Sequence, residues 1–228
     1  MRILTDRYQL QQPAPALLIL LPGAYGIPED FVGYGFVSAL RAQQLPMDIA
    51  MLELPFNQVA DDSLLAEIHD QLVQPALAAG QTVWLAGISI GGYLAMAYAE
   101  RYANEIAGMF LMAPYPGNRM TTNEIMVAGG LTSWNPEDGA AIDTERRIWR
   151  WLKESAILNM PIHLGIGQDD RFSAGHRMMA AALPPTHVDS ISGGHEWVIW
   201  RQLWQNFLDR QFIQESLSES SQLQGDPL

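Results

Sequence analysis

One serine stands between glycines at a point where a strand-like run gives way to a helix-like run. The segment Gly87–Gly91 (Gly-Ile-Ser-Ile-Gly) follows the apolar run Thr82–Ala86 and precedes the alanine-rich stretch Gly92–Ala99. Small residues two before and two after Ser89 permit a tight turn that pushes the hydroxyl out above a sheet. The positive end of the following helix favours negative charge that develops beside this hydroxyl. The context predicts a nucleophilic serine.

A serine hydroxyl is a weak nucleophile until a base removes its proton, and the chain offers one histidine in a suitable place. His195 follows the strand-like segment Val188–Ser192 and precedes a long amphipathic helix. Two adjacent acids, Asp169 and Asp170, follow the strand-like segment Ile162–Gly167. The order serine, acid, histidine, each just past the carboxyl end of a predicted strand, is the order found in α/β hydrolases.

The chain resembles members of the α/β-hydrolase superfamily, specifically small serine esterases of the carboxylesterase kind. Four segments carry the resemblance, which extends from about residue 16 to about residue 212: Leu20–Gly26, Gly87–Gly92, Gly167–Asp170 and Gly193–Trp197. One departure is Pro22, because many relatives carry a histidine before the glycine of this first loop. The backbone amide that the loop supplies does not depend on that histidine.

The resemblance implies a role for each residue. Ser89 would attack an acyl carbonyl, and His195 would take its proton and return it to the leaving alcohol. Water would then hydrolyse the acyl-enzyme. Two backbone amides are the expected donors to the carbonyl oxygen: that of Ile90, directly after the nucleophile, and one from the first loop, at Ala24 or Tyr25.

The two adjacent acids compete for the role of orienting His195. If the backbone is still extended after Gly167, successive side chains point to opposite sides, so only one of the two can face the histidine. The family pattern places the acid three residues after this glycine and selects Asp170. Asp169 would then hydrogen-bond the loop or pair with Arg171.

Apolar runs and amphipathic stretches alternate along the chain. Such alternation predicts an α/β fold with a mostly parallel sheet, right-handed crossovers and helices on both faces. We expect a helix N-cap at Asp61 or Asp62 and a helix stop at Gly80. The predicted strands are Ala16–Leu21, Asp48–Leu54, Thr82–Ala86, Gly108–Ala113, Ile162–Gly167 and Val188–Ser192, and the predicted helices are Phe31–Gln44, Asp61–Ala79, Gly92–Ala99, Thr144–Glu154 and Glu196–Phe212.

This rhythm stops between residues 115 and 160, where related folds insert a cap. We therefore expect one hydrolase domain over residues 1–212 with a small cap insertion at 115–160, followed by a flexible polar tail at 213–228. The alternative is that the insertion only packs on the sheet edge. Tyr115 and Trp134, with Met120 and Met126, are apolar members of this segment and are expected either to contact an apolar acyl group or to pack in the core.

Composition narrows the class of protein. With 228 residues, 48% of them apolar, the chain suits a single α/β domain. Cysteine is absent, which leaves no disulfide or thiolate metal site. The start lacks the apolar core of a signal peptide, and the run Leu17–Leu21 is too short to span a membrane, so we expect a soluble, cytoplasmic protein without membrane partners.

Charge argues against nucleic acid as a partner. The net charge is −12, from 25 acidic and 13 basic residues, and Arg146, Arg147 and Arg150 alternate with tryptophans as on a solvated helix face. No His, Asp or Glu grouping has metal-ligand spacing, so no metal or cofactor is implied. Structural or surface roles are expected for the other four histidines, which are His69, His163, His176 and His187.

Serine ester hydrolysis of a small or medium acyl substrate is thus the predicted function. Thioesterase, lactonase and small-amide hydrolase activities would use the same three side chains and remain open. A non-catalytic ligand receptor on this fold is a further alternative, which fold alone does not exclude. Haloalkane dehalogenase chemistry is disfavoured, because its nucleophile would be an aspartate where this chain has Ser89.

Overall fold

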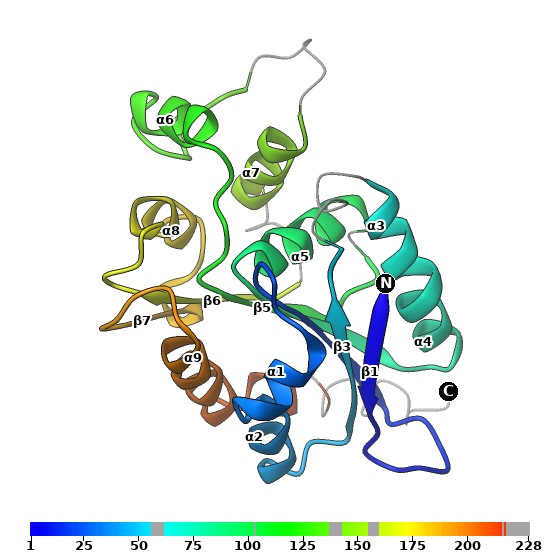
Figure 1. The fold of residues 1–228 in the computed structure, drawn as a ribbon. Coiled ribbons are helices and arrows are strands. Elements are labelled where there is room, and N and C mark those ends of the chain that lie inside the picture. Colours follow the sequence, from blue (N-terminus) through cyan, green and yellow to red (C-terminus); the bar gives the residue numbers. More distant parts are fainter. Residues whose placement is uncertain (56–61, 103, 137–142, 155–159, 216, 218–228) are drawn as a thin grey trace, which may run out of the picture.

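The computed structural model describes residues 1–55, 62–102, 104–136, 143–154, 160–215 and 217. Within these residues, seven strands form one sheet in the order β1-β3-β2-β4-β5-β6-β7 (Figure 1). All neighbouring pairs are parallel except β1 with β3, which is antiparallel. The strands are β1 (Arg2–Asp6), β2 (Ala16–Leu21), β3 (Met47–Glu53), β4 (Thr82–Ile88), β5 (Gly108–Met112), β6 (Ile162–Gly167) and β7 (Val188–Ile191).

Helices cover both faces of the sheet (Figure 1). The described α-helices are α1 (Pro28–Gly33), α2 (Phe36–Ala42), α3 (Asp62–Ile68), α4 (Gln74–Ala78), α5 (Ile90–Arg101), α6 (Arg119–Val127), α7 (Thr144–Glu154), α8 (Ser173–Ala180) and α9 (Trp197–Asp209). Side chains of α1, α2 and α9 form one core layer, and those of α3, α5, α7 and α8 form the other. Strand β2 serves both layers, since Leu18 and Leu20 face the first and Leu17, Ile19 and Leu21 the second.

The predicted α/β-hydrolase fold is confirmed, and most predicted elements lie within two or three residues of the observed ones. Buried parallel strands read as continuous apolar runs, which is why β2 and β6 match the predicted bounds. Helix Phe31–Gln44 was predicted as one element, and this is wrong. It is two helices, α1 and α2, separated at Gly35, whose φ of 80° is left-handed.

Three further elements were not predicted: β1, α6 and α8. Among the described strands β1 is an edge strand that pairs with β3, and it has no fully buried residue, so it carries no long apolar run. Helix α8 lies in a stretch that reads as polar loop. The predicted stop at Gly80 is confirmed, with φ at 77°, whereas the predicted cap Asp61 and the side chain of Asp62 lie outside the described part of the chain.

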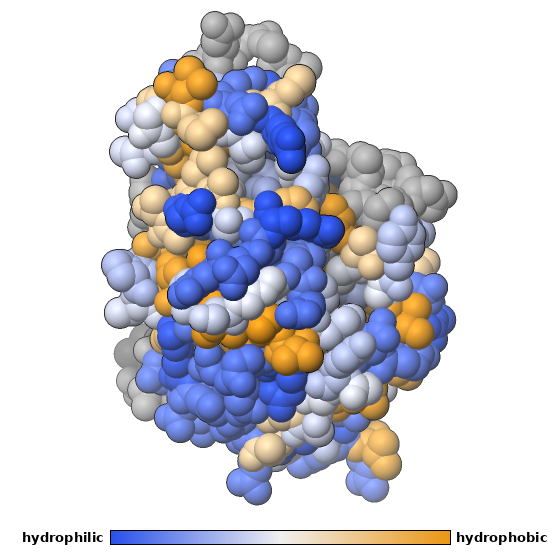
Figure 2. Space-filling model, turned by 60° about the vertical axis from the view of Figure 1, so that its left-hand side comes forward, coloured by the Kyte–Doolittle hydropathy of each residue, from blue (hydrophilic) through white to orange (hydrophobic). Residues whose placement is uncertain are grey.

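The insertion predicted at 115–160 contains α6 and α7, which extend beyond the sheet (Figure 1). Helix α7 buries Ile148, Trp149 and Leu152 in the core layer beside α5, and α6 lies farther out. Apolar groups are exposed on this outer part, among them Met120, Met126 and Val127 (Figure 2). Of the helices in the described ranges, none has the length and apolar character to cross a membrane.

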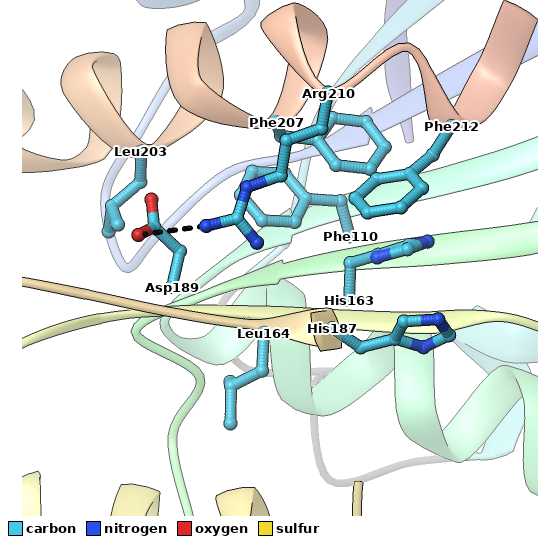
Figure 3. Close-up of a pocket in the computed structure, with 9 residues that line it drawn as sticks. All are labelled: Phe110, His163, Leu164, His187, Asp189, Leu203, Phe207, Arg210 and Phe212. Atoms are coloured by element: carbon cyan, nitrogen blue, oxygen red, sulfur yellow. Dashed lines mark ion pairs between the residues drawn. The ribbon is translucent and has the colours of Figure 1, made fainter. Parts of the chain in front are cut away.

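A group of aromatic and titratable side chains lies between β6, β7 and the end of α9. His163 of β6 is only 2% exposed, and its ring stacks on Phe212 at 3.9 Å and lies 4.4 Å from the ring of His187 (Figure 3). Neither ring nitrogen of His163 has a hydrogen-bond partner among the described residues. Beside it, Arg210 pairs with Asp189 at 3.3 Å.

Burial, with smaller effects from the charges of His187 and Arg210, lowers the pKa of His163 from 6.5 to about 3. Between these two values the unfolded chain binds a proton that the folded chain does not, so stability is lost as pH falls. Between pH 7 and pH 5, the free energy of unfolding should therefore fall by about 2 kcal/mol less in His163→Phe than in the wild type, as measured by urea denaturation.

A histidine with the opposite shift provides the control. A hydrogen bond with Asp70 is the main cause that raises the pKa of His69, so this group contributes stability that grows as pH falls. His69→Gln should therefore steepen the loss between pH 7 and pH 5. Equal pH dependence in the wild type and His163→Phe would contradict the assignment of the acid sensitivity to His163.

Candidate active site

The backbone turns sharply at Ser89, between β4 and α5. Ser89 has φ 52° and ψ −115°, a conformation that non-glycine residues rarely adopt. A Cβ at Gly87 would lie 2.4 Å from the Gly91 carbonyl oxygen, and a Cβ at Gly91 would lie 2.2 Å from the Leu21 carbonyl oxygen. The flanking glycines are therefore required by close backbone approach. The side chain of Ser89 lies at the carboxyl end of β4, where the predicted turn placed it.

His195 reaches both partners that the sequence suggested. Its Nε2 lies 2.9 Å from Ser89 Oγ, and its Nδ1 lies 2.7 Å from Asp170 Oδ2. A carboxylate only accepts hydrogen bonds, so Nδ1 carries the proton and Nε2 is left to accept from the serine hydroxyl. The arrangement can thus remove a proton from Ser89 and keep the resulting imidazolium beside a carboxylate.

Asp170 is buried, and its charge is compensated locally. Burial alone would raise the pKa of its carboxyl group, but the hydrogen bond with His195 and one from the Phe172 amide, at 2.8 Å, lower it below its ordinary value. Asp170 is therefore ionised at neutral pH.

Asp169 points away from His195 and holds the loop that carries it. Its Oδ2 accepts a hydrogen bond from the Gly193 amide at 3.2 Å, and its own amide donates to the Gly193 carbonyl at 2.9 Å. The two neighbouring acids thus face different partners, as predicted, although the backbone after Gly167 is a turn, closed by the Asp170 amide on the Gly167 carbonyl at 3.2 Å, and not the extended chain that the prediction assumed. Arg171, the other suggested partner of Asp169, lies over the ring of Phe172 at 4.9 Å.

The first loop lies directly against the serine. A Cβ at Gly23 would be 3.7 Å from Ser89 Cβ, and a turn closes the loop through the Gly26 amide and the Gly23 carbonyl at 3.0 Å. Within the described residues, the Ala24 amide has no hydrogen-bond partner. Ile90 is the first residue of α5 and lies ahead of the helical bond from Tyr93 to Ser89. Among the described residues these two amides thus lack a backbone acceptor, one next to Ser89 in the chain and one next to Gly23, which packs against Ser89. The side chain of Tyr25, the other residue suggested in this loop, is 86% exposed to solvent, and its backbone φ is 62°.

Of the two predicted substrate contacts, only Tyr115 lies near the triad. The Tyr115 ring packs edge-on against Phe172 at 5.5 Å, and Phe172 packs edge-on against His195 at 5.3 Å. Trp134 is only 3% exposed and belongs to the core layer of α5 and α7. Packing in the core, which the sequence left open as an alternative, is the arrangement observed for Trp134.

Sequence reasoning missed several side chains around the site. Phe172 and Trp200 flank the ring of His195, at 5.3 and 5.0 Å, and their residue types alone do not distinguish them from core aromatics. Their positions, two residues after Asp170 and five after His195, were the available signal. Among the residues that the structure describes, no group of three His, Cys, Asp or Glu side chains could hold a metal ion.

Comparison with known proteins gives matches in structure alone. No family model matches the chain, and no curated protein sequence matches it. The similar solved structures include FphF, a fluorophosphonate-binding serine hydrolase of Staphylococcus aureus, with a TM-score of 0.61, 12% identity and 91% of each chain covered.

A monoacylglycerol lipase of Paleococcus ferrophilus is similar with a TM-score of 0.61 and 17% identity, covering 96% of this chain and 99% of that one. The α/β hydrolase MGS-MChE2, from a lagoon-sediment metagenome, matches with a TM-score of 0.59 and 14% identity over 93% and 94% of the two chains. Identities this low carry the fold and no finer property. The sheet order, the helices on both faces and these neighbours together show that the chain has the α/β-hydrolase fold.

Proposed function

We propose that this protein is a serine hydrolase that cleaves carboxylic ester bonds of small or medium acyl substrates through an acyl-enzyme intermediate. The observation that carries the proposal is the continuous contact from Ser89 Oγ through His195 to the buried Asp170 carboxylate. Each contact has the length of a good hydrogen bond, and each donor and acceptor has the polarity that proton removal from Ser89 requires.

In the proposed mechanism, Ser89 Oγ attacks the acyl carbonyl while His195 Nε2 takes its proton. The tetrahedral intermediate collapses as His195 returns the proton to the leaving alcohol, and Asp170 holds the imidazolium throughout. Water, activated by the same histidine, then releases the acid. The amides of Ile90 and of Ala24 or Tyr25 would bind the negative oxygen, each contributing about 3 kcal/mol to barrier lowering.

Ester cleavage is supported by the likeness to proteins described as lipases and esterases, including a ferulic acid esterase, and the neighbours also include an S-formylglutathione hydrolase. A thioesterase, lactonase or small-amide hydrolase would use the same triad. In our proposal residues 115–160 form the cap of a single domain spanning residues 1–212, and Tyr115 lines the acyl site. The flexible tail at 213–228 and the cytoplasmic location stay predictions of the sequence.

Replacement of the nucleophile tests the reaction class. Ser89→Ala should abolish hydrolysis of p-nitrophenyl esters and covalent labelling by a fluorophosphonate, while circular dichroism and the melting temperature stay as in the wild type. Backbone donors would leave residual catalysis on the order of 10³-fold over water. Ser190→Ala, which removes an exposed hydroxyl from β7, is the matched control and should keep full activity. Undiminished turnover by folded Ser89→Ala would refute the proposal.

Separate replacement of the two neighbouring acids tests which of them orients His195. Asp170→Asn should lower kcat by about 10⁴-fold, because the amide favours the wrong imidazole tautomer. Asp169→Asn weakens only the bond to the Gly193 amide and should cost about tenfold or less. The measurement is kcat for both variants on one ester. The reverse ranking would reassign the acid, and two mild effects would place it elsewhere in the chain.

A further inference from the structure

The segment at the end of β5, residues 112–116, holds the backbone of Ser89 from both sides. The Ser89 amide donates to the Met112 carbonyl at 3.0 Å, and the Tyr115 amide donates to the Ser89 carbonyl at 2.8 Å. The peptide groups before and after the nucleophile are therefore both bound to this one segment. Because Ser89 Oγ is only two bonds from its own backbone, the segment determines where the hydroxyl lies.

Within this segment, the amide of Ala113 donates to the Gly165 carbonyl of β6 at 2.8 Å, but two of the next three residues have no amide to donate. Pro114 and Pro116 have no N–H, so only their carbonyl groups can form backbone hydrogen bonds. Both carbonyls accept from buried side chains of other helices: Pro114 from Nε2 of His176 in α8, and Pro116 from Nε1 of Trp149 in α7, each at 2.9 Å. Two side-chain donors thus bind the segment at the two residues that cannot donate a backbone hydrogen bond themselves.

His176 is completely buried, and its tautomer is determined by its partner. A carbonyl oxygen only accepts, so Nε2 carries the proton, and Nδ1 has no partner among the described residues. Burial lowers the pKa of His176, although the charge of Asp170 opposes this effect. The lowered pKa keeps the ring neutral. The neighbouring Gly175 lets α8 approach closely, since a Cβ there would lie 2.6 Å from Pro116 Cβ.

Helix α8 also begins at the proposed triad acid. Phe172 is its N-cap residue, and the Phe172 amide donates to Asp170 Oδ1 at 2.8 Å. One turn later, His176 holds the Pro114 carbonyl. A single short helix therefore connects the carboxylate that orients His195 with the segment that holds Ser89.

Resting on the function proposed above, we propose that His176 is a positioning residue: its Nε2–H holds the Pro114 carbonyl and so fixes Ser89 relative to the Asp170–His195 pair. It touches neither substrate nor the reacting atoms. Its loss should displace the nucleophile slightly without changing the groups that bind substrate.

The kinetic test compares two replacements of this histidine. His176→Phe keeps a ring but loses the donor, and should lower kcat by about 10- to 100-fold with KM changed less than about twofold. His176→Gln places an amide nitrogen near the Nε2 position and should restore kcat to within about threefold of the wild type. If His176→Phe does not fold, His176→Asn serves instead, because the asparagine side chain is too short for its amide nitrogen to reach the Pro114 carbonyl.

His163→Phe is the matched control, since it replaces another buried histidine whose ring nitrogens have no partner in the described part of the chain. At pH 7.5 it should retain kcat within about twofold. Wild-type kcat in His176→Phe, an equal loss in His163→Phe, or failure of His176→Gln to exceed His176→Phe would each overturn the proposal.

Hydrogen exchange tests the positioning independently of catalysis. In His176→Phe, the Ser89 and Tyr115 amides should exchange about tenfold faster or more, while amides of β2 keep their wild-type rates, because only the local segment is released. Uniform acceleration of all amides, or none at Ser89 and Tyr115, would overturn the role. If wild-type protein neither hydrolyses esters nor reacts with a fluorophosphonate, the proposed function fails, and the exchange rates still decide whether His176 holds this segment.

Discussion

The close approach of three backbone segments around Ser89 is the constraint on which the site depends. Any side chain at Gly91 would collide with the carbonyl groups of Leu21 and Pro22, the latter 2.5 Å from a Cβ there. The end of β2 therefore lies directly on the first turn of α5. This contact brings the first loop beside Ser89, where a Cβ at Gly23 would lie 3.7 Å from Ser89 Cβ, without any long side chain to place the loop.

The second requirement is an ionised carboxylate without access to water. Isolated burial of Asp170 would favour its neutral form, and a neutral acid would not stabilise a charged His195. Donors from two elements prevent this: the imidazole from the loop before α9, and the Phe172 amide at the start of α8. The placement of α8 is thus coupled to the charge of the site through the Phe172 amide.

Local patterns predicted the parts of this protein that are determined locally. The strands β2 and β6 are buried on both sides and read as mostly apolar runs, and Gly87 avoids a clash with Gly91, four residues further along the chain. His176 could not be found this way, because its partner Pro114 is 62 residues away. For the same reason the sequence left open whether Trp134 contacts an acyl group or packs in the core, and the packing beside α7 places it in the core.

Two of the five non-glycine residues with positive φ in the described part of the chain lie at Ser89 and at the segment bonded to it. Ser89 and Ala113 both have positive φ, at 52° and 45°, and each such residue costs on the order of 1–3 kcal/mol. Such conformations persist only where the surroundings over-determine them. Here they do, since Ser89 bonds to residues on either side of Ala113, and the Ala113 amide donates to the Gly165 carbonyl of β6 at 2.8 Å. Because β6 leads directly to Asp170, the strained turn that exposes the hydroxyl is bonded to the strand that delivers the acid, and neither can shift without the other.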